Sequence, residues 1–229
     1  MAGSWEISQG KEVLVGILHV DVTTVAWAKA LREMHIPGQI MCVAGMPYDH
    51  ARNTICQATL QHGFRNCFML DSDVMTPPDA IPRLLAHRQP IVSGVYFRRS
   101  PPHGLPVAMR CVRNAKGEFE GFQWVTDLPP GGLIEVDVVG SGCLLLRRDL
   151  LEVFARKPQR PGKTWFDWKV DMQTFLPKEE CLSEDYTMCM HAKKLGFKTM
   201  LDTSIRCRHV GYGEAGYGTF LPLDTNMAA

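Results

Sequence analysis

The stretch Phe68–Val74, which reads FMLDSDV, joins an apolar run to two aspartates that are separated by one residue. The apolar part, together with Cys67 before it, is typical of a short buried strand at 67–70. Asp71 and Asp73 follow it directly. Because ligands of open α/β sheets bind outside the carboxyl ends of the strands, both carboxylates are expected at the ligand-binding edge of a sheet.

Strand and helix patterns alternate on both sides of this stretch. Apolar runs predict strands at 12–20, 39–45 and 90–97. Helical spacing of apolar residues predicts helices at 22–34, 50–62 and 79–87. Asp49 is placed to cap the second helix. Alternation of this length indicates an α/β fold with a Rossmann-like, mostly parallel sheet that is flanked by helices.

The second half of the chain adds an antiparallel insert. Two partly alternating runs, 107–112 and 118–125, surround the turn residues Asn114–Gly117 and predict a hairpin. Further strands are predicted at 133–139, 142–146 and 198–205, with helices at 148–155 and 186–195. Neither a repeat nor a break in composition divides the chain, so we predict one domain over 1–229.

Composition excludes several classes of protein. The 229 residues carry a net charge of +1, so the chain as a whole has no field that attracts nucleic acid or an anionic membrane. No apolar run is long enough to span a membrane, and the first residues do not resemble an export signal. The eight cysteines lie singly in apolar runs, which favours reduced core thiols. We expect a soluble, cytoplasmic protein whose oligomeric state is open.

The two aspartates are suited to a divalent cation. Carboxylates hold Mg²⁺ or Mn²⁺ while leaving positions for phosphate oxygens, and such an ion neutralises a diphosphate leaving group. The alternative for an isolated Asp-x-Asp is a capped turn between a strand and a helix.

The order of motifs resembles the GT-A fold of nucleotide-sugar-dependent glycosyltransferases over about 12–212. The motifs are, in order, VGILHV, Ala51-Arg52-Asn53, FMLDSDV, VGSGCLLLRRDLL, LSEDYTMCMHAKKLGF and Arg208-His209. The resemblance implies a donor-binding half at about 12–100, an acceptor and base half at about 101–212, and a mobile tail at 213–229.

The resemblance also assigns residues of the donor site. It implies Asp73 as the principal ligand of Mn²⁺ or Mg²⁺, Asp71 as a contact of the donor ribose or the metal, and His209 as a third ligand. Arg52 is expected to contact the nucleoside-diphosphate sugar, because guanidinium suits phosphate. The alternatives are a hydrogen-bonded surface histidine at position 209 and a salt bridge on the helix surface for Arg52.

The pair Glu184-Asp185 heads a predicted helix, and the resemblance places the catalytic base there. Asp185 is the expected base, because a general base takes the proton of the acceptor hydroxyl as it attacks the sugar carbon. Attack from the face opposite the leaving diphosphate predicts inversion. The alternative is that these carboxylates only cap the helix.

The basic, aromatic loop at 156–169 is the expected acceptor site. Its candidate contacts are Arg160, Lys163, Trp165 and Trp168, with Gly142 as a position of close backbone approach. Aromatic rings with basic side chains suit nucleic acid, and small proteins of this kind resemble enzymes that glycosylate hydroxymethylated bases of phage DNA. That reading implies the host cytoplasm. A glycan or small-molecule acceptor, which stacks on tryptophan alone, is the alternative.

Two other functions fit parts of the pattern. Haloacid-dehalogenase-like phosphatases also carry a strand followed by Asp-x-Asp, but they carry it on an early strand, whereas two strand–helix units precede Asp71 here. A module that binds a sugar nucleotide without turnover is the third alternative.

Overall fold

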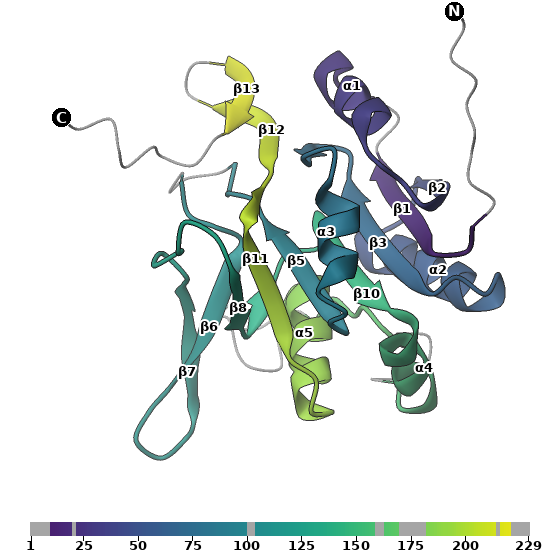
Figure 1. Cartoon of the computed structure of the whole chain (residues 1–229). Coiled ribbons are helices and arrows are strands. Elements are labelled where there is room, and N and C mark those ends of the chain that lie inside the picture. The colour runs from purple at the N-terminus through teal and green to yellow at the C-terminus, as the bar shows by residue number, and fades with distance from the viewer. Residues whose placement is uncertain are drawn as a thin grey trace, which may run out of the picture.

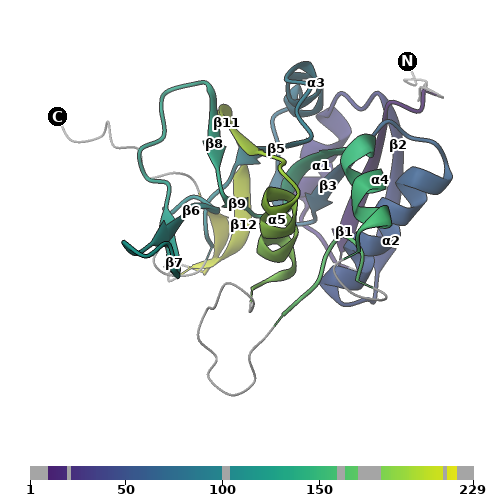
Figure 2. The same ribbon diagram turned by 90° about the horizontal axis from the view of Figure 1, so that it is seen from below.

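The computed structural model describes residues 10–19, 22–99, 104–158, 163–169, 182–213 and 216–220. Its centre is a seven-stranded sheet in the order β2-β1-β3-β10-β5-β11-β8 (Figures 1 and 2). The strands are β1 (Val13–His19), β2 (Gly38–Ala44), β3 (Asn66–Asp71), β5 (Ile91–Val95), β8 (Leu133–Val136), β10 (Cys143–Arg147) and β11 (Thr199–Arg206).

Strand directions confirm the predicted α/β class. β2, β1 and β3 are parallel, β5 and β11 are parallel to each other, and β10 pairs antiparallel with both β3 and β5. Five strands therefore run one way, while β10 and β8 oppose them. The carboxyl ends of β1, β3, β5 and β11 consequently lie at one edge of the sheet.

Helices cover both faces of the sheet (Figure 2). The side chains of β3 alternate, with Phe68 and Leu70 in one apolar cluster and Cys67 and Met69 in the other. Helices α1 (Val25–Glu33) and α3 (Ala80–Ala86) pack on the first cluster. Helices α2 (Tyr48–Gln61), α4 (Arg148–Arg156) and α5 (Glu184–Lys194) pack on the second.

Two small sheets flank the central one. The predicted insert is confirmed, because β6 (Ala108–Arg113) and β7 (Phe119–Trp124) form an antiparallel hairpin, and β9 (Val138–Val139) pairs with β6. The other sheet joins β4 (Val74–Met75), β12 (Arg208–Gly213) and β13 (Gly216–Phe220). The tail that we expected to be mobile from residue 213 therefore contains a strand, and 214–215 and 221–229 lie outside the described residues.

One predicted helix cap is wrong. α2 begins at Tyr48 after Pro47, so Asp49 lies inside the first turn, where its carboxylate accepts from Lys163. Proline suits the start of a helix because its φ is already helical and it has no N–H to leave unpaired.

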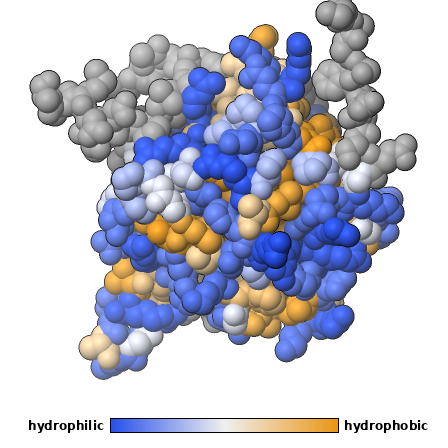
Figure 3. Space-filling view, in the orientation of Figure 1, coloured by the Kyte–Doolittle hydropathy of each residue, from blue (hydrophilic) through white to orange (hydrophobic). Residues whose placement is uncertain are grey.

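The cysteines and the surface agree with a compact apolar core. All seven cysteines in the described ranges carry free thiols, and five of them are buried. No helix that the structure describes combines the length and the apolarity that crossing a bilayer requires. On the face shown in Figure 3, apolar side chains form separate patches among hydrophilic ones.

Candidate active site at the carboxyl edge of the sheet

The turn that carries the two aspartates is held by hydrogen bonds from α1 and β12. The indole N–H of Trp27 lies 3.1 Å from the carbonyl of Asp71 and 3.0 Å from that of Val74. The amide of Val210 donates to the carbonyl of Asp73 over 2.7 Å. The backbone between β3 and β4 is therefore fixed at the edge where sequence reasoning placed it.

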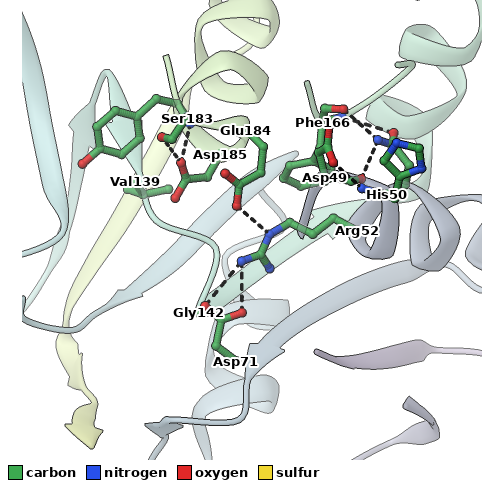
Figure 4. Close-up of polar contacts among 12 residues, drawn as sticks. Asp49, His50, Arg52, Asp71, Val139, Gly142, Phe166, Ser183, Glu184 and Asp185 are labelled. Atoms are coloured by element: carbon green, nitrogen blue, oxygen red, sulfur yellow. Dashed lines mark hydrogen bonds and ion pairs between the residues drawn. The ribbon is translucent and has the colours of Figure 1, made fainter. Parts of the chain in front are cut away.

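Arg52 is buried at the centre of the site (Figure 4). Its side chain is 4% exposed, and its Nη2 lies 3.0 Å from Oδ1 of Asp71. Its Nε lies 3.3 Å from Oε1 of Glu184. The alternative of a salt bridge on the helix surface is wrong, because the guanidinium joins α2, β3 and α5 inside the protein.

One donor of this guanidinium is unsatisfied. Nη1 of Arg52 is buried and has no hydrogen-bond partner among the described residues. Leaving a buried donor unpaired costs about 1–3 kcal/mol, so such groups in native proteins commonly serve a ligand or an ordered water.

The two carboxylates at the start of α5 lie in different surroundings. Burial, with the negative charge of Asp185 beside it, raises the pKa of Glu184 to about 7, although Arg52 opposes the shift. Burial also raises the pKa of Asp185, which accepts hydrogen bonds at Oδ1 from the hydroxyl of Ser183 and, over 2.8 Å, from the amide of Tyr186. Both of these hydrogen bonds go to Oδ1 and not to Oδ2. A raised pKa and an oxygen outside these bonds suit a carboxylate that accepts a proton.

Asp73 and His209 form the second half of the site. Nε2 of His209 lies 3.4 Å from Oδ2 of Asp73, and its Nδ1 lies 2.7 Å from the carbonyl oxygen of Phe97. Arg99 forms an ion pair with the same Asp73 oxygen. Burial alone would raise the pKa of Asp73, but His209 and Arg99 lower it, so the carboxylate stays ionised.

These side chains partly fit the predicted metal site. Asp73 and His209 lie together, whereas Asp71 is held by Arg52. The described part of the chain holds no group of three or more His, Cys, Asp or Glu side chains placed to bind a metal ion. Mg²⁺ and Mn²⁺ prefer oxygen ligands, and Mn²⁺, as a first-row transition metal, also accepts an imidazole nitrogen. Mg²⁺ is commonly held by one or two carboxylates together with phosphates and waters. A two-residue site is consistent with that chemistry.

Gly142 forms a wall of the site by close packing. Its amide donates to the Tyr96 hydroxyl over 3.1 Å, and an added Cβ would lie 2.7 Å from Cγ2 of Val74 and 3.3 Å from Oδ2 of Asp71. Sequence reasoning missed Tyr96, because nothing in the run PIVSGVYF distinguishes it from a core residue.

The predicted acceptor loop is only partly available. Trp165 is 8% exposed, and its indole donates to the carbonyl of Leu151 over 2.9 Å, so the prediction that it stacks on an acceptor is wrong. Lys163 is paired with Asp49. Trp168 is 47% exposed. Arg160 lies outside the described residues.

Asn53 fixes the backbone of the loop that carries Trp165. Its amide oxygen accepts from the backbone N–H groups of Trp165 and Phe166 at 3.0 and 3.2 Å, and its Nδ2 donates to the carbonyl of Phe166 over 2.7 Å. These bonds fix the backbone of the loop to α2, and the indole bond to the carbonyl of Leu151 holds the Trp165 ring in the core. Asn53 was visible in the sequence as the neighbour of Arg52, but nothing in its position indicated that it would bond to the loop.

The comparisons with known proteins establish the fold. No family model matches the chain, and its sequence matches no curated protein. The crystal structure of A197 from STIV superposes with a TM-score of 0.55 at 14% identity, covering 93% of this chain and 95% of that one. The inositol-1-phosphate CTP transferase from T. maritima gives a TM-score of 0.41 at 12% identity, covering 85% and 86%. The first likeness confirms the α/β architecture over nearly the whole chain.

Proposed function

We propose that this protein is a metal-dependent glycosyltransferase of the GT-A type, which moves a sugar from a nucleoside diphosphate to an acceptor hydroxyl. The observation that carries the proposal is the meeting of two charged groups at one sheet edge. Asp73 and His209 form one group, and Arg52 joins Asp71 to Glu184 in the other, with Asp185 beside it.

The donor half of the proposal uses the first group. Asp73 and His209 would hold Mn²⁺ or Mg²⁺, and the bound ion neutralises charge on the diphosphate leaving group. Arg52 orients Asp71 toward the donor, and its unpaired Nη1 supplies a hydrogen bond to the bound nucleotide sugar.

The acceptor half uses Asp185. Its Oδ1 is held by Ser183 and Tyr186, so Oδ2 is the oxygen that takes the proton of the attacking hydroxyl. A base on the side of the sugar away from the diphosphate gives inversion of configuration. The charge of Arg52 favours the ionised form of both carboxylates and so opposes the effect of their burial.

Replacing Asp73 by asparagine should abolish the Mn²⁺-dependent binding of nucleoside diphosphates while leaving the protein folded. The reason is that Asp73 lies at the sheet edge with its side chain 28% exposed, so its loss removes a ligand but no core packing. Calorimetric titration of the variant measures this, with Asp127→Asn, from an exposed ion pair, as the matched control. Unchanged affinity in Asp73→Asn would remove the metal assignment.

The reaction separates this proposal from the alternatives. A glycosyltransferase slowly releases nucleoside diphosphate from its donor in the presence of Mn²⁺ without an acceptor. A phosphatase releases inorganic phosphate from phosphomonoesters, and a binding module releases neither product.

For the acceptor, we propose a ring that stacks on Trp168, such as a sugar or a hydroxymethylated DNA base. Trp168→Ala should weaken acceptor binding by about 1–3 kcal/mol, which appears as a higher KM for the acceptor, because stacking on an exposed indole is lost. Donor binding should be unchanged. Steady-state kinetics with each acceptor class measure this. If DNA is the acceptor, its affinity also falls with rising salt, whereas a glycan shows little salt dependence. An unchanged KM would exclude Trp168 from the acceptor site.

A further inference from the structure

One carboxylate oxygen at the site serves two partners. Oδ2 of Asp73 forms an ion pair with Arg99 and also faces Nε2 of His209, 3.4 Å away. The Arg99 side chain is 52% exposed, so solvent reaches it freely. An exposed ion pair contributes little to stability, about 0–1 kcal/mol, so this guanidinium leaves its partner at small cost.

His209 is oriented toward that oxygen by backbone. The carbonyl of Phe97 can only accept a hydrogen bond, so Nδ1 of His209, at 2.7 Å, carries a proton. Nε2 of the same ring faces the Asp73 carboxylate. The ring packs edge-on against Tyr96, with the centroids 5.4 Å apart, which fixes its plane. An imidazole nitrogen and a carboxylate oxygen thus lie side by side, and both are ligand types that metal cations accept.

In this structure the cation at the Asp73 oxygen is Arg99. A guanidinium and a divalent metal ion compete for one carboxylate oxygen, because like charges a few ångströms apart repel, and even two unit charges then interact by about 1–4 kcal/mol near a protein surface. Binding of a metal ion at Asp73 and His209 therefore favours movement of Arg99 away from this oxygen. The diphosphate that such an ion binds offers Arg99 another anionic partner. The planar guanidinium suits it, because it can donate two hydrogen bonds to phosphate oxygens.

We propose that Arg99 is a displaceable counter-ion that occupies the cation position at Asp73 in the empty site and binds the diphosphate of the donor in the loaded site. This inference rests on the proposed function. Arg99 then has two opposite effects on affinity. It lowers the affinity for a metal ion alone, because it competes for Asp73, and it raises the affinity for diphosphate at the metal-loaded site.

The test compares two titrations by calorimetry, Mn²⁺ alone and pyrophosphate at saturating Mn²⁺. In Arg99→Ala, the affinity for Mn²⁺ alone should rise by about threefold to tenfold, because a competing cation is gone. The affinity for pyrophosphate should fall by about tenfold, because a charge-assisted pair is lost. Arg99→Lys, which keeps the charge but not the fork, should restore weaker Mn²⁺ binding and only part of the pyrophosphate affinity.

Arg110→Ala is the matched control, because Arg110 forms an exposed ion pair with Asp127 elsewhere, and both of its affinities should equal those of the unchanged protein. If Arg99→Ala lowers both affinities, or changes neither, the counter-ion inference is wrong while the metal site stands. If the unchanged protein binds neither Mn²⁺ nor pyrophosphate, the proposed function fails, and the inference fails with it.

Discussion

Replacing Arg52 by methionine should lower the free energy of unfolding at pH 8 by about 3 kcal/mol, because the change leaves Glu184 buried without a counter-charge. Removing one partner of a buried ion pair costs about 3–5 kcal/mol, and the lower end applies because Asp71, the second partner, is partly exposed. Urea unfolding measures the loss. Arg110→Met, from an exposed pair, should cost under about 1 kcal/mol.

The loss should depend on pH with a definite sign. Burial and the charge of Asp185 raise the pKa of Glu184 from its ordinary 4.5 to about 7, so this carboxyl destabilises the folded state progressively as pH rises between those values. Arg52 opposes that shift, and its removal raises the pKa further. The deficit of Arg52→Met is therefore smaller at pH 5 than at pH 8.

A second variant isolates the carboxylate. Glu184→Gln in the Arg52→Met background should recover much of the loss at pH 8, because a neutral amide needs no counter-charge. An equal deficit at pH 5 and pH 8, or no recovery in the double variant, would show that Arg52 acts through packing alone.

Much of the fold could be read from the sequence, because local signals determine most of it. The run FMLDSDV gave both a buried strand and the position of the carboxylates, and the apolar runs before it gave β1 and β2. The direction of β10 could not be read. Its residues Cys143–Leu146 are buried on both faces, so they have the same pattern in a parallel and an antiparallel strand.

The residues of the site could be predicted from the sequence, but the ion pairs between them could not. Arg52, Asp71 and Glu184 were all singled out, yet their joint ion pair spans 132 residues of sequence, and no local rule places such distant side chains in contact. The same limit applies to Trp165. An aromatic residue among basic ones is typical of an exposed platform, and only tertiary contacts, among them the indole bond of Trp165 to the carbonyl of Leu151, show that its ring is buried.

Replacing Asp185 by asparagine should lower kcat by about 10²–10⁴-fold with donor affinity unchanged, because general-base catalysis contributes that much and acts only when the acceptor proton moves. Asparagine keeps an Oδ1 that accepts from Ser183 and Tyr186, so the start of α5 stays intact.

The pH profile tests the same assignment. Burial raises the pKa of Asp185, and the base must be ionised to accept a proton, so the kcat of the unchanged protein should rise with pH through that raised pKa. The residual activity of Asp185→Asn should lack this rise, and Asp127→Asn should keep it. The carboxylate would have no part in proton transfer if Asp185→Asn kept its turnover, as the helix-capping alternative requires. Donor affinity that falls in step with kcat would instead place Asp185 in the donor site.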